Sequence, residues 1–429
     1  MIIKNAYIWT NGKFIKKDLY FEKGEFVSEP SENSKIINLE GKYILPGFSD
    51  SHAHILGVGI KVLTINLDEF SFEQIFKAKN DVILGRGWEE LPENIHILDE
   101  IQKPIILIRK CGHVAWLNKT AQKYLKFKNY LIYEQEIEKI WSLLPDDFYI
   151  KAFKKGEEEF LKYGITSVHS DDFHGISFEI LENLLKESKL RIYEKLNTAE
   201  PWNYNFGSYG ISKIFGIKLF ADGSLGGKTA YLSSPYKESD SCGKFVLPNN
   251  FSKIVDFANK NNLQVCVHTI GDEALTRVLD LFGRNFGHRI IHAQLIKESD
   301  FPRLKNFVFS IQPHFAIEDK EIIKNVSLKN VLFYPFKRMY ENKIRISFSS
   351  DAPVSPHNPQ YVIKNALKIG FSFEESIKLY TETSGEIINE KIGKLKPGYK
   401  ADFVVFNDTD LTSIHSVFVN GEKVYSSLT

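Results

Sequence analysis

Two histidines near the beginning of the chain have a spacing that suits metal binding. His52 and His54 form a His-x-His pair in the segment DSHAH, which follows an apolar run and the turn Pro46-Gly47. On a β-strand, residues i and i+2 point to the same face, so both rings could bind one ion. Lone histidines are usually structural, and the pair alone gives a metal site about an even chance.

Four more polar side chains lie at or near the ends of apolar, β-rich runs. Lys218 lies in GIKLFADG, His268 in VCVHTIGD, His292 in RIIHAQ, and Asp351 follows ISFSS. A buried lysine or carboxylate is unfavourable unless its charge is lost, paired or bound to a cation. Each residue has a structural alternative, such as an outward-pointing Lys218 whose amine reaches solvent. Their shared position at strand ends favours a single metal site.

Apolar β-rich runs alternate with helical patterns over most of the chain, which predicts an α/β fold of parallel βα units. Eight such runs are present, the number required by a (β/α)₈ TIM barrel. The six polar residues then lie at the carboxyl ends of strands 1, 4, 5, 6 and 8, where barrel active sites are found. The competing topology is a doubly wound open sheet. In this chain such a sheet would lack the glycine-rich phosphate loop expected after its first strand. The expected strands are Phe48–Ile55, Ile165–Ser170, Arg191–Leu196, Gly216–Ala221, Leu263–Thr269, Arg289–Ala293, Val308–Pro313 and Ile344–Ser350.

Both ends of the chain consist of short alternating segments separated by turn signals such as Asn11-Gly12 and Gly421. Neither end alone could bury a sheet face, so we expect the two termini to form one small β-sandwich. The stretch from His54 to Gly164 is far longer than one helical crossover and predicts an insertion after strand 1. The expected domains are a sandwich of residues 1–47 and 391–429 and a barrel of residues 48–390, with 60–150 as an inserted lobe.

The composition is that of an ordinary soluble protein, with 43% hydrophobic and 25% charged residues and a net charge of +1. This balance gives no reason to expect a nucleic acid or a membrane as a partner. Three scattered cysteines without a CxxC pair argue against a disulfide framework or a structural zinc ribbon. We see no apolar run of transmembrane length and no leader-like N-terminus, and therefore expect a cytoplasmic protein.

The order His-x-His, Lys, His, His, Asp on strands 1, 4, 5, 6 and 8 is similar to the amidohydrolase superfamily, in its two-metal form with a carboxylated lysine. The segments LPGFSDSHAH, IKLFADGSLGGKTA, VHTIGDEAL and SSDAPV resemble the subgroup that contains the N-substituted formamide deformylases. The segment GKLKPGYKADFVVF resembles the return of the chain into the superfamily's sandwich domain. Members of this subgroup tend to have Gly before the strand-8 Asp, where this chain has Ser350, which leaves the substrate open.

The resemblance implies a centre of two divalent ions, most simply zinc, and a small-molecule amide as substrate. The implied reaction is hydrolysis of a C–N bond (amide, formamide or related) other than a peptide bond by metal-activated hydroxide. Asp351 would accept the proton of the attacking water and pass it to the leaving nitrogen. Dimers are common for such barrels, so a homodimer is an expectation. The implied ligands are His52, His54 and Asp351 for one ion, His268 and His292 for the other, and a carbamate of Lys218 between them.

Trp88 and His113, within the expected insertion, are candidates for a substrate-facing wall. The alternative is that Trp88 packs the core of the lobe and His113 satisfies a local hydrogen bond. Lys337 and Arg338 follow strand 7 and could meet an anionic or carbonyl group, although a solvated loop is the simpler interpretation.

His169 and His174 flank an acidic pair after strand 2, where we expect a supporting or structural role.

Two other functions remain open. A mononuclear deaminase would have a glutamate three residues after the strand-5 histidine, where this chain has Gly271. A catalytically silent scaffold would be expected to lose ligands, whereas this chain retains all six.

Overall fold

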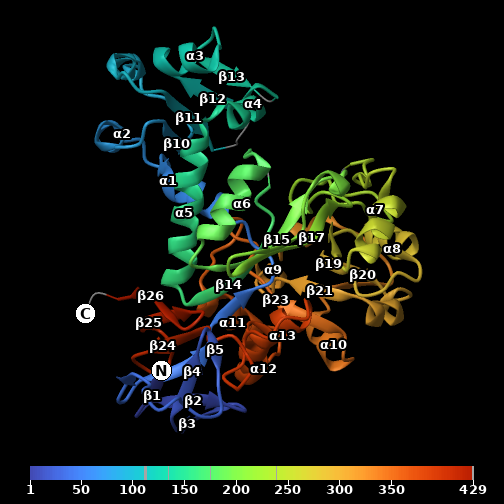
Figure 1. The fold of residues 1–429 in the computed structure, drawn as a ribbon. Coiled ribbons are helices and arrows are strands. Elements are labelled where there is room, and N and C mark those ends of the chain that lie inside the picture. Colours follow the sequence, from blue (N-terminus) through green and yellow to red (C-terminus); the bar gives the residue numbers. More distant parts are fainter. Residues whose placement is uncertain (111–113, 134, 174, 238, 428–429) are drawn as a thin grey trace. The chain divides into compact units, whose positions relative to one another are not determined.

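The computed structural model describes residues 1–110, 114–133, 135–173, 175–237 and 239–427 (Figure 1). The chain divides into two compact units. Unit 1 comprises Met1–His54, Phe160–Phe173 and Leu185–Thr429, and unit 2 comprises Ile55–Glu159 and His174–Leu184. Among the described residues, no helix has the length and apolar character needed to span a membrane.

The centre of unit 1 is a parallel sheet of eight strands in sequential order, which confirms the predicted TIM barrel. The ring is brought close to closure where the backbone N–H of Ser51 donates to the carbonyl of Phe348, at 3.1 Å. A short strand, β16 (Gly207–Tyr209), pairs antiparallel with β17 outside the ring. The barrel strands are β8 (Phe48–Asp50), β14 (Ile165–Ser170), β15 (Arg191–Asn197), β17 (Ser212–Phe220), β18 (Gln264–Thr269), β19 (Arg289–His292), β21 (Val308–Ile311) and β23 (Arg345–Phe348).

The predicted extent of the first strand is wrong, because β8 ends at Asp50 and not at Ile55. The carboxylate of Asp50 accepts hydrogen bonds from the backbone N–H groups of His52 (3.2 Å) and Ser350 (3.0 Å). A side chain that bonds nearby backbone groups competes with the sheet ladder, and the chain leaves the strand here. His52 and His54 therefore lie in the loop before helix α1 (Ile55–Leu63), and strand alternation is not what brings their rings together.

The connections between barrel strands are less regular than a helix after every strand. 3₁₀ turns lie at Pro201–Asn203 between β15 and β17, at Phe301–Asn306 between β19 and β21, and at Ile322–Asn325 between β21 and β23. A two-stranded sheet of β20 (Leu295–Lys297) and β22 (Val331–Phe333) lies beyond β19. The helices that follow β14 along the chain are α6 (Phe178–Glu187), most of which belongs to unit 2, and α7 (Phe251–Lys260), α8 (Asp272–Phe282), α9 (Phe315–Glu318), α10 (Phe336–Glu341), α11 (Pro359–Lys368), α12 (Phe373–Leu379) and α13 (Glu382–Glu386) of unit 1.

Both termini of the chain build one β-sandwich, as the sequence predicts; its blue and red strands lie side by side in Figure 1. One sheet has the order β26-β25-β24-β7-β2-β3 and the other β5-β4-β1-β6. Their apolar faces meet around Phe21, Phe403 and Phe418, with the last two rings stacked at 4.4 Å. The strands are β1 (Ile2–Lys4), β2 (Tyr7–Thr10), β3 (Lys13–Lys16), β4 (Leu19–Glu22), β5 (Glu25–Phe26), β6 (Ile36–Asn38), β7 (Tyr43–Pro46), β24 (Phe403–Phe406), β25 (Ile414–Val419) and β26 (Glu422–Ser426).

Unit 2 contains its own sheet, with the order β13-β12-β11-β10-β9. A Cβ on Gly156 would lie 2.0 Å from the carbonyl oxygen of Ile55, so helices α1 and α5 pack with their backbones in contact. The strands and helices are β9 (Thr64–Asn66), β10 (Ile83–Trp88), β11 (Ile105–Arg109), β12 (Val114–Leu117), β13 (Leu131–Tyr133), α1 (Ile55–Leu63), α2 (Phe72–Lys77), α3 (Lys119–Leu125), α4 (Gln135–Leu143) and α5 (Asp146–Lys162).

Candidate metal centre

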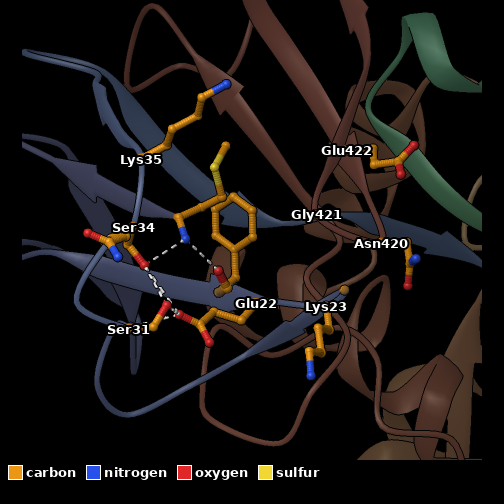
Figure 2. Close-up of a pocket in the computed structure, with 12 residues that line it drawn as sticks. Glu22, Lys23, Ser31, Ser34, Lys35, Asn420, Gly421 and Glu422 are labelled. Carbon is orange, nitrogen blue, oxygen red and sulfur yellow. Dashed lines mark hydrogen bonds between the residues drawn. The ribbon is translucent and has the colours of Figure 1, made fainter.

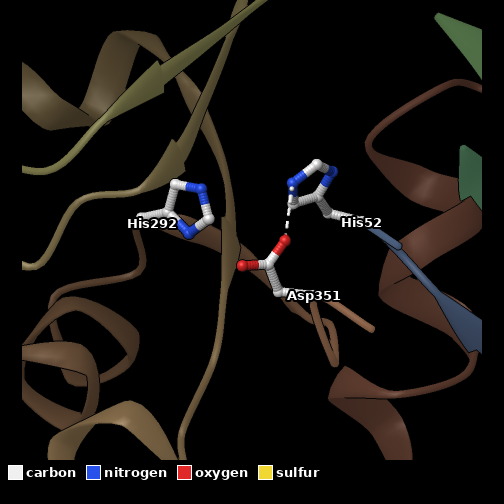
Figure 3. Close-up of side chains that lie close together, drawn as sticks. All are labelled: His52, His292 and Asp351. Atoms are coloured by element: carbon white, nitrogen blue, oxygen red, sulfur yellow. Dashed lines mark ion pairs between the residues drawn. The ribbon is translucent and has the colours of Figure 1, made fainter. Parts of the chain in front are cut away.

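Histidine and aspartate side chains from both edges of the barrel ring meet at its carboxyl end. Nε2 of His52 lies 3.1 Å from Oδ1 of Asp351, and Nε2 of His54 lies 3.4 Å from the same oxygen. His292, at the end of β19, completes a cluster in which the donor atoms of His52, His292 and Asp351 lie within 4.8 Å of one another (Figure 3). The three come from positions 52, 292 and 351, and the barrel brings them together.

The orientation of the His292 ring is set by a chain of hydrogen bonds from two neighbouring strands. The Ser349 hydroxyl donates to the carbonyl of Ile311 at 3.2 Å and accepts from Nε2 of Gln312 at 2.9 Å. The other end of the Gln312 amide, Oε1, therefore accepts from Nδ1 of His292 at 2.9 Å. A ring that donates from Nδ1 presents the lone pair of Nε2, which is the arrangement of metal-binding histidines.

Asp171, directly after β14, belongs to the same cluster and was not predicted. Its Oδ1 lies 2.9 Å from Nδ1 of His54, and its Oδ2 accepts a 2.5 Å hydrogen bond from Nζ of Lys218. Together with His52 and His54 it forms a second group of donor atoms within 4.8 Å of one another. Each of the two histidine rings thus lies between two carboxylates, Asp171 on one side and Asp351 on the other.

The carboxylates and imidazoles of this cluster shift one another's pKa values. Burial acts to raise the pKa of Asp351, but hydrogen bonds from His52 and His54 hold it well below its usual range. Burial acts to lower the pKa of His54, yet the neighbouring Asp171 and Asp351 raise it to about 10. Burial and the charge of Lys218 hold the pKa of His52 well below its usual range, so this ring is neutral. A neutral imidazole is the form that binds a cation.

Lys218 and His268 lie at the same end of the barrel but outside both donor groups. Lys218 is 1% exposed, so the outward-pointing alternative is wrong, and its amine is paired with Asp171. The His268 ring lies 4.5 Å from the His292 ring, and its Nε2 is bonded to the carbonyl of Gly223 at 3.0 Å. The structure therefore brings four of the six predicted ligands, His52, His54, His292 and Asp351, to one point, and places the other two beside it.

The backbone is strained at two of the candidate ligands. His292 has φ = 76° and Asp351 has φ = 56°, both in the left-handed region that non-glycine residues rarely adopt. Such conformations cluster at functional sites, because the surrounding structure has to hold them in place. Here they turn both side chains into the mouth of the barrel, His292 at the last residue of β19 and Asp351 just beyond β23.

The donor set fits a divalent cation. Nδ1 of His52 is buried without a hydrogen-bond partner among the described residues, and the ring is 1% exposed. Imidazole nitrogens combined with carboxylate oxygens are ligands that zinc and its first-row neighbours accept. Buried carboxylates in such a cluster also need a cation nearby.

A cavity of about 370 Å³ opens onto this cluster. Beyond the candidate ligands its walls are mostly apolar, and its polar contributors are Ser224, Gln294 and Asp319. The lining residues are His52, His54, Lys218, Phe220, Ser224, Leu225, Gly226, His268, Ile270, His292, Gln294, Phe315, Asp319, Asp351 and Val354.

The other predicted site residues have their own contacts. Trp88 packs in the core of unit 2 and its indole N–H donates to the carbonyl of Leu107 at 2.9 Å, as in the structural alternative considered above. His113 and His174 lie outside the described residues.

Lys337 and Arg338 are paired with glutamates, Lys337 with Glu375 at 2.8 Å and Arg338 with Glu298 at 3.0 Å. His169 is buried and bonded to Arg289 at 2.8 Å, a supporting role inside the barrel.

A second hollow, of about 410 Å³, lies on the sandwich (Figure 2). The hydroxyls of Ser31 and Ser34 both donate to Glu22, and the amino group of Met1 donates to the Ser34 hydroxyl. These polar groups satisfy one another, and the pKa of Glu22 is lowered by the bonds from Ser31.

Comparison with known structures defines the class of this protein. Its fold matches the crystal structure of a metal-dependent hydrolase from Pyrococcus horikoshii with a TM-score of 0.83 and 26% sequence identity, over 99% of each chain. That likeness, together with the buried histidine and aspartate donors at the mouth of the barrel, makes this chain a metal-dependent hydrolase.

The family follows from the sequence as a whole. The model of the amidohydrolase family matches residues 35–425, and the chain belongs to that family. It is 27% identical to a Bacillus subtilis protein with the name "Putative amidohydrolase YtcJ", over 92% of this chain and 91% of that one. It is also 20% identical to an adenine deaminase of Clostridium perfringens, over 99% of this chain and 59% of the deaminase.

Proposed function

We propose that this chain hydrolyses a C–N bond of a small-molecule amide, formamide or related compound other than a peptide, using two divalent ions. The observation that carries the proposal is the convergence of His52, His54, His292 and Asp351, with Gln312 fixing the His292 ring. Similarity of the strand-end motifs to N-substituted formamide deformylases supports a formamide as one substrate to test.

The residues have separate parts in this proposal. His52, His54 and Asp351 would hold one ion, and His268 and His292 the other, with Lys218 carboxylated between them; zinc suits this set of nitrogen and oxygen ligands. His268 would first have to release the Gly223 carbonyl, and Lys218 would have to release Asp171. When bound, the ions would supply activation of water and polarisation of the substrate carbonyl.

Asp351 is the residue we assign to proton transfer. Its pKa lies well below the usual range, so the carboxylate is ionised at neutral pH. It is 7% exposed, which leaves it accessible from the cavity while shielding it from bulk water. Asp351 would take the proton of the attacking water and deliver it to the leaving nitrogen.

The main rival function is deamination by a mononuclear centre, which would have a glutamate at position 271. The surroundings of Gly271 argue against a glutamate side chain there. A Cβ on Gly271 would lie 2.0 Å from the carbonyl oxygen of Tyr231. The Gly271 N–H donates to Asp222 at 2.7 Å, which fixes the backbone there. A side chain as large as glutamate does not fit without moving this loop.

Metal analysis and a substrate screen test the proposal together. We expect about two ions per chain, hydrolysis of N-formyl, N-acyl or cyclic amides by the metal-loaded protein, and no hydrolysis after chelation. Asp351→Asn should lower kcat by about a hundredfold or more. A single ion with release of ammonia from an aminated ring would support the deaminase, and a protein that takes up no metal would support the scaffold.

A further inference from the structure

The walls of the cavity beside the metal centre are unusually apolar and partly uncovered. Phe220 is 39% exposed and Val354 is 70% exposed, and Phe315 stacks on the His292 ring at 6.3 Å. Leu225 and Ile270 complete the apolar lining. Exposed apolar side chains grouped around a cavity mark a place where an apolar ligand group is buried.

Beyond the candidate ligands, Asp319 and Gln294 contribute acceptor oxygens on one side of this cavity, and Ser224 contributes a hydroxyl. Gln294 is 2% exposed, and its Oε1 is buried with no partner among the described residues. Asp319 is half-buried; its Oδ2 accepts a 2.5 Å hydrogen bond from the hydroxyl of Tyr334, and no described cation is paired with it. The carboxylate of Asp319 is therefore the acceptor that this side of the cavity presents, and it is complementary to an N–H donor.

Beyond the candidate metal ligands, the described lining holds no positively charged side chain that could bind a substrate carboxylate. Lys218 is the one lysine among the described lining residues, no arginine is among them, and the Lys218 amine is held by Asp171. The cations that the sequence suggested for an anionic group, Lys337 and Arg338, are paired with glutamates and do not line the cavity. A substrate carboxylate would instead meet the carboxylate of Asp319.

We infer that the substrate of this site carries an apolar group beside the scissile bond and an N–H or ammonium donor that binds Asp319, and that it carries no carboxylate. This inference rests on the proposed function and specifies its substrate class: acyl derivatives of apolar amines that are neutral or positively charged. Asp319 is then a specificity residue, since it selects by charge and takes no part in bond cleavage.

Three matched compounds test the inference on the metal-loaded protein. N-formyl-phenylalaninamide has the apolar group and the N–H donor, N-formyl-phenylalanine replaces the donor with a carboxylate, and N-formyl-glycinamide lacks the apolar group. We expect kcat/KM for the first to exceed that for each of the others by about tenfold or more. Equal or better cleavage of the carboxylate would overturn the inference while leaving the hydrolase intact.

Variants locate the effect. Asp319→Asn should bring the amide-to-carboxylate ratio of kcat/KM towards one, whereas Glu318→Gln should leave it unchanged, because Glu318 binds Ser355 and Tyr361 and does not line the cavity. Val354→Lys, at a position exposed enough to accept it, should raise kcat/KM for the carboxylate. An unchanged ratio in both Asp319→Asn and Val354→Lys contradicts the inference.

Calorimetric binding of the same compounds separates this inference from the proposed function. If none of the three is hydrolysed, the proposed amide chemistry fails for this class. The order of affinities still decides the inference: tighter binding of the amide supports it, and tighter binding of the carboxylate overturns it.

Discussion

Replacing Asp171 with Asn tests how the metal centre is held together. The substitution keeps the shape of the side chain and removes the negative charge that pairs with Lys218 at 2.5 Å and with His54 at 2.9 Å. It leaves the ammonium of Lys218, which is 1% exposed, without an anionic partner in the protein interior. It also removes the carboxylate that orients Nδ1 of His54.

Two effects of different size are expected. Breaking a buried ion pair by removing one partner costs about 3–5 kcal/mol, so the metal-free variant should unfold at a clearly lower urea concentration. Loss of the carboxylate behind a metal-binding histidine weakens metal affinity by about 10- to 100-fold, which is about 1.4 to 2.7 kcal/mol. Urea unfolding of the metal-free protein and competition with a chromogenic chelator measure the two effects separately.

Asp402→Asn is the matched control. Asp402 also forms a buried ion pair, with Nε and Nη2 of Arg191 at 2.7 and 3.0 Å, but Arg191 begins β15 at the end of the barrel opposite to the metal centre. This variant should lose comparable stability and keep its metal affinity within about twofold, because distant sites contribute independently. Wild-type metal affinity in Asp171→Asn, or an equal loss of affinity in both variants, would refute the assigned role of Asp171.

Two further predictions concern stability. Burial lowers the pKa of His288 to about 4, and its neutral Nδ1 accepts from the backbone N–H of Val265, so the unfolded chain binds the extra proton below its own pKa of 6.5. The free energy of unfolding, measured with urea, should therefore fall by about 3 kcal/mol as the pH drops from about 6.5 to 4. This part of the pH dependence should be absent in His288→Asn. In unit 2, Gly156→Leu forces a side chain against the carbonyl oxygen of Ile55. It should lower the free energy of unfolding by about 2 kcal/mol or more and the thermal transition by several degrees. Glu158→Ala, at an exposed position on the same helix, is the control and should change the transition little.

Much of the barrel could be predicted because its strands are β-branched apolar runs that end in polar residues. The strand Ile165–Ser170 was predicted to the residue, and most others to within one or two; β17 begins four residues before its predicted start. The end of the first strand could not be read from its own sequence. It depends on the bond from the Ser350 backbone to Asp50, which joins positions 300 residues apart.

Asp171 and Gln312 show why part of the centre is hidden in the sequence. Asp171 follows an apolar strand just as Asp351 does, so its position in the sequence pointed to a possible ligand. His169 and Asp172 lie at the end of the same strand, however, and the sequence alone does not distinguish the three. Contact with Lys218 and His54 is what distinguishes Asp171, and only the fold supplies it. Gln312 orients His292 through an amide whose direction is fixed by Ser349 on the next strand, a relation among three strands that has no local pattern.

Charge balance connects Asp171 with the proposed carboxylation of Lys218. In the metal-free protein two anions, Asp171 and Asp351, face two cations, Lys218 and the protonated His54, so the centre is close to neutral. Adding divalent ions to this cluster repels both cations, because like charges at these distances in a buried site interact strongly. His54 can respond by releasing its proton to become a ligand. Lys218 cannot leave, since its backbone is fixed in β17. Its ammonium would instead lose one proton, and the resulting amine would react with dissolved carbon dioxide and release a second proton, so that a carbamate with one negative charge replaces one positive charge. Asp171 then changes from the partner of an ammonium to the carboxylate that orients His54, which is why we place it at the centre of the site.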